Sequence, residues 1–228
     1  MTSTSPLIHV IRHGEALHNI QRPYPDRDPP LTEAGHRATK GIKLDFTPDL
    51  ILISPMTRTF QTALNIFPFL QSPSLSPSPE VQVWPDLRET HDSSPCNQGL
   101  PSAELSEVFP QFDFSECHPE WDYASHTTEG AIERAEVVRR RLKEVAGTGR
   151  YANIVIVTHR GFIAFLAKGR RFDVCERRTF RFATEKEVQQ QGVRRGVNCD
   201  TLEEQDFGPS VLVLHEKKAD WEIARDNF

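Results

Sequence analysis

Short apolar runs rich in branched aliphatic residues alternate along the chain with longer stretches that carry a polar face. The apolar runs predict buried strands at Leu7–Ile11, Leu50–Ile53, Val81–Val83 and Asn153–Val157. The stretches between and after them predict helices at Thr32–Lys40, Thr57–Phe67, Glu129–Ala146 and Phe162–Ala167. Two late strands are expected at Arg177–Ala183 and Ser210–His215. This alternation favours an α/β fold, in which helices cover both faces of a mostly parallel sheet.

Two of the predicted helices carry signals at their first turn. Thr32 suits the N-cap position, and Glu33 follows it in the first turn. Pro55 lies close to the start of the helix predicted from Thr57, where proline is tolerated.

Three stretches lack a regular pattern. Ser72–Glu80 is rich in serine and proline and is expected to be a surface loop. Asp86–Thr128 is expected to be a lid or insertion over a site, because long irregular segments inside a domain are more often functional than idle. Its aromatic residues either line an apolar pocket or, more often, form a small local core: Phe109, Phe112, Phe114, Trp121 and Tyr123. Glu185–Gly208 is polar and expected to be exposed.

The composition limits the number of domains, the kinds of partner and the location of the protein, but it does not indicate a reaction. The chain has 228 residues, 37% hydrophobic and 26% charged, which suits a single α/β domain with the insertion at 86–128. A net charge of −5 argues against a nucleic-acid partner. No secretory signal or membrane-spanning run is apparent. The four cysteines form no CxxC pair, which suits reduced thiols and a cytoplasmic location: Cys96, Cys117, Cys175 and Cys199.

Polar residues follow three of the predicted strands at the point where each strand ends. They are Arg12-His13-Gly14, Ser54-Pro55 and Thr158-His159-Arg160. Ligands of α/β sheets bind at the carboxyl ends of the strands. All three groups are therefore expected at one edge of the sheet. Arg58 lies one turn into the helix after Ser54-Pro55 and is within reach of the same edge.

Two histidines beside two or three arginines suit a phosphoryl group. The arginine fork matches phosphate oxygens, whereas the cations repel a metal ion, and no carboxylate or thiolate cluster is evident. A neutral His13 can attack phosphorus and form a phosphohistidine. Glu89 is the best candidate to protonate the leaving group and then to activate water. Taken singly, each residue is more often structural or solvated, and only their joint placement favours a site that needs no cofactor.

The sequence resembles the histidine phosphatase superfamily, the phosphoglycerate mutase-like fold, over roughly Leu7 to Phe182. The motifs that carry the resemblance are Arg12-His13-Gly14-Glu15 with Asn19, Pro30–Gly35, Ser54–Ala63, Leu87-Arg88-Glu89 and Val157-Thr158-His159. The resemblance implies a three-layer α/β/α sandwich and no metal. It implies that His13 is phosphorylated, that Arg12, Arg58 and His159 complete the phosphate pocket, and that Glu89 is the proton donor. Asn19 is expected beside the pocket.

The chain departs from the family pattern at several positions. Arg160 stands where this branch usually has glycine, and Ala16, Leu17 and His18 replace the usual residues of the mutases. Arg160 either points to solvent or contacts a second anionic group of the substrate, such as a second phosphate or a carboxylate. Arg170 and Arg171 are candidates to add to that contact.

Three functions remain open at the level of sequence. The departures favour a phosphatase acting on a small phosphorylated metabolite, which can be a diphosphate, over a phosphoglycerate mutase. A catalytically silent domain that binds a phosphorylated ligand is disfavoured, because His13 and Glu89 are both present. The substrate and the oligomeric state are not predicted, since specificity lies in the loops Gln21–Pro30 and Asp86–Thr128.

Overall fold

A six-stranded sheet forms the centre of the molecule in the computed structural model, which describes residues 5–71, 79–91, 93–124, 127–190 and 192–215. Its order is β3-β2-β4-β1-β5-β8, and the strands span Glu80–Val83, Leu50–Ile53, Asn153–Thr158, Leu7–Arg12, Arg177–Phe182 and Leu212–Leu214. The first four strands in this order are parallel. The strands β5 and β8 complete the sheet in antiparallel pairings.

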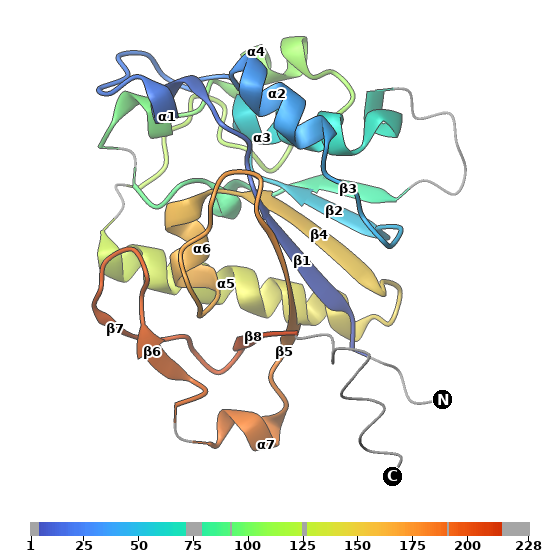
Figure 1. The fold of residues 1–228 in the computed structure, drawn as a ribbon, viewed down its shortest axis with the longest axis vertical. Helices are drawn as coiled ribbons and strands as arrows, with labels where there is room; N and C mark the ends of the chain where they lie inside the picture. The colour runs from blue at the N-terminus through green and yellow to red at the C-terminus, as the bar shows by residue number, and fades with distance from the viewer. Residues whose placement is uncertain (1–4, 72–78, 92, 125–126, 191, 216–228) are drawn as a thin grey trace.

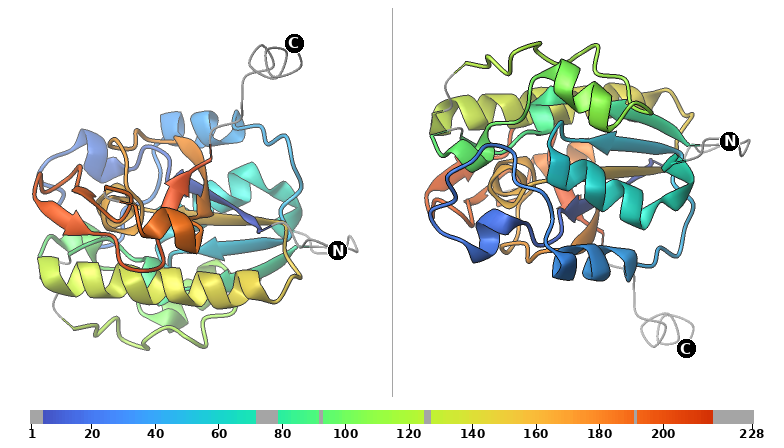
Figure 2. Two further views of the ribbon diagram at one scale, coloured as in Figure 1. Left: turned by 90° about the horizontal axis from the view of Figure 1, so that it is seen from below. Right: turned by 90° about the horizontal axis from the view of Figure 1, so that it is seen from above.

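Helices cover both faces of this sheet, so the fold is the predicted three-layer α/β/α sandwich (Figure 1). The helices α2, α3 and α4 lie on one side, at Glu33–Lys40, Thr57–Ile66 and Ser102–Val108. On the other side lie α5 and α6, at Thr128–Gly147 and Arg160–Leu166. The view from below has α5 toward the viewer, and the view from above has α2, α3 and α4 toward the viewer (Figure 2).

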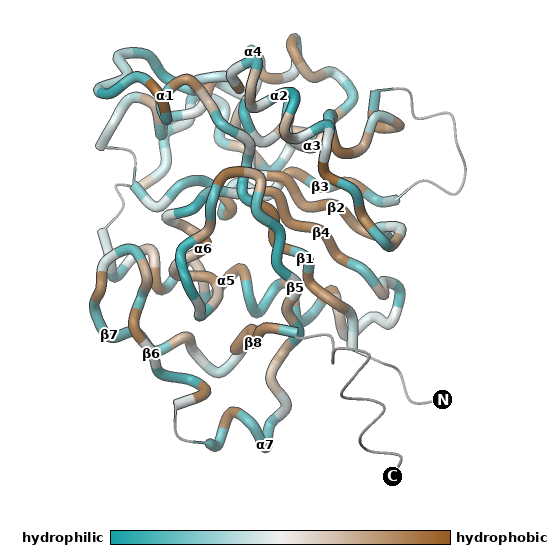
Figure 3. The backbone as a smooth tube through the Cα atoms, in the orientation of Figure 1, coloured by the Kyte–Doolittle hydropathy of each residue, from teal (hydrophilic) through white to brown (hydrophobic). Residues whose placement is uncertain are grey.

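Alternate residues of the central strands enter two different cores. Ile154 and Ile156 of β4 join the core under α5 and α6. Val155 and Val157 of the same strand join the core under α3. A strand buried on both faces has no polar side to show, and the central strands are accordingly the most continuously apolar part of the backbone (Figure 3).

The predicted elements of the first two-thirds of the chain are present within a few residues of their expected bounds. Thr32 caps α2, and its hydroxyl accepts a hydrogen bond from the Gly35 backbone amide at 2.9 Å. The helix predicted from Phe162 begins earlier, at Arg160, so this arginine belongs to its first turn. Most of the loop predicted at Ser72–Glu80 lies outside the described residues, and Glu80 itself begins β3.

The prediction that Glu185–Gly208 is simply exposed was wrong in part. The segment forms α7 at Glu185–Val188 and a two-stranded hairpin of β6, Arg195–Val197, and β7, Glu204–Asp206. Asn198 and Gln205 are buried in it, at 1% and 3% exposure. Buried amides are rare unless they have hydrogen-bond partners, and both find them on α6. Short polar strands of this kind carry no apolar periodicity that a sequence pattern could detect.

The segment 86–128 has two parts with different surroundings. Its later aromatic residues pack in the core under α3, where the Phe60 ring lies 4.9–5.4 Å from the rings of Phe109, Phe112 and Phe114. Trp121 is also buried, and its ring lies edge-on to Tyr123 at 5.1 Å. The three phenylalanines therefore form core, whereas Tyr123 is half-buried. Residues of the earlier part, at 89–91 and 93–97, line a cavity of about 800 Å³.

Candidate active site

The ends of β1, β4 and β2 bring the predicted polar residues to one edge of the sheet. The amide of His13 donates to the carbonyl of Thr158 at 3.0 Å, and that of Ser54 donates to Val157 at 3.1 Å. The imidazole rings of His13 and His159 consequently lie 5.2 Å apart, centroid to centroid. The register of three parallel strands thus builds the centre of the site.

Two buried arginines flank these histidines. Arg58 is the second residue of α3, is fully buried, and donates from Nη1 to the carbonyl of Cys96 at 3.0 Å. Arg12, at the end of β1, donates from Nη1 to the carbonyl of Phe172 at 3.0 Å. Burial lowers the pKa of Arg12 to about 10, and Arg160 nearby acts in the same direction.

Several buried nitrogens of this cluster have no hydrogen-bond partner among the described residues. They belong to Arg12 (Nε), Arg58 (Nε and Nη2), His18 (Nδ1) and His159 (Nδ1). Most buried polar atoms in proteins are hydrogen-bonded, and each exception needs an explanation. Burying a cation without a partner is especially costly. A cluster of unpaired donors of this kind is chemically suited to an anion with several oxygens.

The tautomer of His13 follows from its backbone contact. Its Nδ1 lies 2.7 Å from the Gly14 carbonyl oxygen, which can only accept, so Nδ1 carries the proton. Burial, followed by the charges of Arg58 and Arg12, holds the pKa of His13 well below its usual value. The ring is therefore neutral near pH 7, and Nε2 keeps a free lone pair.

His159 is held by a second short contact. Its Nε2 lies 2.7 Å from the Ser54 hydroxyl oxygen, and both residues are fully buried. Burial and the charge of Arg58 also lower the pKa of His159 well below its usual value. When Ser54 donates to Nε2, the proton of the neutral ring resides on the unpartnered Nδ1, which becomes a donor for an anion.

Glu89 is positioned against the first turn of α6. Its Oε1 accepts from the amides of Thr90 at 2.8 Å and Phe162 at 2.9 Å. A Cβ atom added at Gly161 would lie 2.5 Å from this oxygen and 2.6 Å from the Thr90 hydroxyl. Only glycine at this position lets the carboxylate sit where it does.

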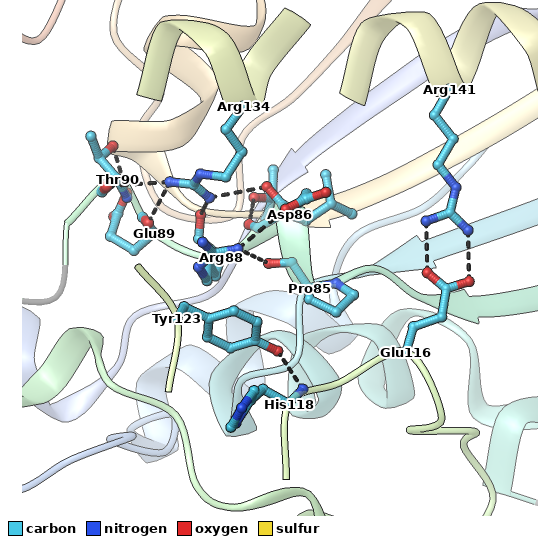
Figure 4. A network of polar contacts seen from close by, with 12 residues as sticks. Pro85, Asp86, Arg88, Glu89, Thr90, Glu116, His118, Tyr123, Arg134 and Arg141 are labelled. Carbon is cyan, nitrogen blue, oxygen red and sulfur yellow. Dashed lines mark hydrogen bonds and ion pairs between the residues drawn. The ribbon is translucent and has the colours of Figure 1, made fainter. Parts of the chain in front are cut away.

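Arg134 of α5 holds the loop that carries Glu89 (Figure 4). Its Nη1 donates to the carbonyls of Asp86 at 3.0 Å and Arg88 at 2.7 Å. Its Nη2 donates to the carbonyls of Glu89 at 2.9 Å and Thr90 at 3.2 Å. One buried guanidinium thus pairs with four backbone carbonyls within the segment 86–90. Sequence reasoning missed Arg134, because a charged residue within an amphipathic helix gives no sign that it is buried.

These side chains surround a cavity of about 800 Å³. Of the predicted residues, those that line it are Arg12, His13, Asn19, Glu89 and Arg160. Arg58 and His159 are fully buried beside them. Asn19 uses its side chain within its own loop, where Oδ1 accepts from the Ala16 amide and Nδ2 contacts His18 Nε2 at 3.1 Å.

His18 was noticed in the sequence only as a departure from the family pattern, yet it also lines the cavity. Burial, with the charges of Arg58 and Arg12, lowers its pKa to about 3. With Nε2 accepting from Asn19, the unpartnered Nδ1 of the neutral ring carries the proton. Within the described residues, no group of three or more histidine, cysteine, aspartate or glutamate side chains is arranged to hold a metal ion.

Comparisons with known proteins identify the family. The family model of the histidine phosphatase superfamily (branch 1) matches residues 8–184. The chain therefore belongs to the histidine phosphatase superfamily, as its motifs indicated. A search of curated proteins found no match.

Solved structures share the fold at low sequence identity. The alpha-ribazole phosphatase from Shigella flexneri is 22% identical over 78% of this chain and 91% of its own, with a TM-score of 0.54. The ecdysone phosphate phosphatase from Bombix mori, in complex with tungstate, is 15% identical over 96% and 99%, with a TM-score of 0.56. A mycobacterial glucosyl-3-phosphoglycerate phosphatase is 18% identical over 92% and 97%, with a TM-score of 0.54.

The role of Arg134 predicts a large loss of stability for Arg134→Lys. Lysine donates from a single nitrogen and would leave several of these buried carbonyls without a hydrogen bond. Each unpaired carbonyl costs about 1–3 kcal/mol of stability. We expect a loss of about 2–3 kcal/mol in the free energy of unfolding by denaturant, with faster hydrogen exchange at the Thr90 and Phe162 amides. The control is Arg141→Lys on the same helix, whose pair with Glu116 is exposed and is worth about 1 kcal/mol or less. Equal losses would contradict the assignment.

The electrostatics predict that His13 does not become protonated as the pH falls from 8 to 6.5. Its lowered pKa means that the neutral form is retained there, and the Gly14 carbonyl means that the proton resides on Nδ1. Long-range nitrogen–proton NMR spectra of the imidazole rings distinguish both tautomers and the cation. An imidazolium signal for His13 at pH 6.5, or a proton on Nε2, would show that the assignment is wrong.

Proposed function

We propose that the protein is a phosphatase that hydrolyses a phosphate ester of a small metabolite through a phosphohistidine intermediate. The observation that carries the proposal is the neutral His13 with Nε2 free, surrounded by buried donors that lack partners. An activated nucleophile beside preorganised donors for the transferred group is what phosphoryl transfer requires.

In the first step, Nε2 of His13 attacks phosphorus and the bond to the ester oxygen breaks. Arg12, Arg58 and Nδ1 of His159 donate to the equatorial oxygens, where charge develops. Glu89 in its acid form gives its proton to the leaving alkoxide. The products of this step are the free alcohol and the phosphohistidine.

In the second step, water attacks the phosphohistidine from the side the alcohol has left. Glu89, now a carboxylate, accepts a proton from the water, and the P–N bond breaks to release inorganic phosphate and neutral His13. Splitting one displacement into two allows the same carboxylate to act as acid and then as base. Asn19 and Arg160 are proposed to contact the rest of the substrate, since both line the cavity.

The cellular setting is part of the same proposal. All four cysteines are free, which suits a reducing compartment, and we assign the protein to the cytoplasm. No helix within the described residues is both long and apolar enough to cross a membrane. The described residues are proposed to form one histidine phosphatase domain, with 86–128 as an insertion that shapes the substrate site.

His13 is the residue on which the mechanism is tested. Rapid-quench labelling with a panel of phosphorylated metabolites is expected to place an acid-labile phosphate on His13, and His13→Ala is expected to abolish both labelling and phosphate release. His36→Gln on α2, outside the cavity, is the control. Turnover that persists in His13→Ala would overturn the mechanism. Isomerisation of phosphoglycerate without phosphate release would indicate a mutase, and binding without either reaction would indicate a silent phospho-ligand-binding domain.

The placement of Glu89 is tested without changing Glu89 itself. Gly161→Ala inserts a Cβ 2.5 Å from Oε1, and we expect the displaced acid to lower kcat by about 10²-fold, as is usual when proton transfer is lost. The control is Gly147→Ala, where an added Cβ meets nothing within 4 Å. The measurement is steady-state phosphate release from an ester of an alkyl alcohol, whose alkoxide is a poor leaving group unless it is protonated. An unchanged kcat for Gly161→Ala would remove Glu89 from the acid role.

A further inference from the structure

The cavity is much larger than one phosphoryl group requires. Its volume of about 800 Å³ lies within the range of about 300–1,000 Å³ that accommodates ligands of drug size. Of the residues assigned to phosphoryl transfer, Arg12, His13 and Glu89 are only a small part of its lining. The remaining walls must therefore contact the part of the substrate that carries the phosphate.

Most of the residues that line the cavity are polar, which suits a substrate with a polar body. Among the residues that line the cavity, large apolar surfaces come only from Pro23, Tyr24, Pro95 and Phe165. The phenylalanines of the insertion lie elsewhere, in the core under α3, and Trp121 and Tyr123 are not among the lining residues either.

Arg160 supplies a cation to the cavity beyond those assigned to the phosphoryl group. It is the first residue of α6, and 32% of its side chain is exposed. Its Nε approaches Asp200 Oδ1 at 3.5 Å, too far for a hydrogen bond, and has no such partner among the described residues. The same Oδ1 already accepts two hydrogen bonds from Arg171, at 3.2 and 2.9 Å. Arg160 thus keeps donors for another anion.

The β6–β7 hairpin fixes Asp200 and Thr201 at the wall beside Arg160. Asn198 Nδ2 donates to the Ala164 carbonyl at 3.2 Å, and Gln205 Nε2 donates to the Phe165 carbonyl at 3.0 Å. Both carbonyls belong to the last turns of α6, where helical partners are missing. The hairpin is thereby attached to the helix that begins with Arg160 (Figure 1). It lies beyond residue 184, where the family match ends.

Resting on the proposed phosphatase function, we propose that the substrate carries a second anionic group, which Arg160 binds at the hairpin wall of the cavity. The guanidinium can donate two parallel hydrogen bonds to a carboxylate or to a second phosphate, because each of these groups presents two charged oxygens on one atom. Asp200 forms an ion pair with Arg160 at 3.5 Å on the hairpin side of the cavity. Of the two other arginines considered in the sequence, Arg171 holds Asp200, and Arg170 pairs with Glu176 outside this cavity.

The proposal is tested with pairs of phosphate esters that differ by one anionic group. Glycerol 3-phosphate is paired with 3-phosphoglycerate, which adds a carboxylate, and fructose 6-phosphate with fructose 1,6-bisphosphate, which adds a phosphate. We expect the more anionic member of at least one pair to show a kcat/KM roughly tenfold higher, about the free energy of one charged hydrogen bond. Whichever pair responds identifies the group. Arg160→Gln and Arg160→Gly are expected to remove the preference, chiefly through KM.

Arg170→Gly is the matched control, because it removes the same charge outside the cavity; its preference should equal that of the wild type. The affinities of both members of each pair for His13→Ala are measured by calorimetry, with and without Arg160→Gln. Equal affinities within every pair, or a preference that survives Arg160→Gln, would overturn the second anionic subsite. A preference in binding without turnover by the wild type would instead overturn only the proposed phosphatase function.

Discussion

The structure depends on the burial of positive charge and neutral imidazole at the ends of three parallel strands. Arg58 and His159 are fully buried, and several nitrogens of the cluster lack partners among the described residues. A fold keeps such a cluster only if the surrounding strands and helices stabilise it enough to offset the cost. The backbone bonds from His13 and Ser54 to the β4 strand provide this rigidity. The unpaired donors are then ready for an anion without reorganisation, which is how preorganised electrostatic sites act.

A further buried arginine, outside this cluster, determines where the Glu89 carboxylate lies. Arg134 binds the carbonyls of the loop around Glu89, and its guanidinium stacks over the Phe162 ring of α6 at 4.5 Å. Gly161 on the same helix leaves the space that the carboxylate occupies. The acid candidate is therefore held from α5 and α6, the opposite layer from the helix that carries Arg58. The site thus lies between the two helical layers. Arg58 comes from α3 in one layer, and α5 and α6 of the other layer hold the segment that carries Glu89.

Much of this could be predicted from the sequence because it depends on local patterns. Continuous aliphatic runs are required by strands that are buried on both faces, so β1, β2 and β4 were evident. Residues that follow such strands meet at one edge, so the convergence of His13, Ser54 and His159 was predictable from topology alone. The family motifs supplied the candidate roles. The β6–β7 hairpin was missed, since its burial rests on two amides that bind helix carbonyls rather than on apolar periodicity.

Local patterns along the chain were enough to predict the fold class, the edge of the sheet that carries the site and the residues at that edge, because each follows from chain direction and hydrophobic periodicity. The protonation and tautomer of His13 could not be predicted in this way, since they depend on the Gly14 carbonyl and on burial near two arginines. The same is true of the buried Arg134, which holds the Glu89 loop, and of Arg160, which faces the cavity beside Asp200. Such features depend on contacts between segments far apart in the chain, which no local pattern encodes.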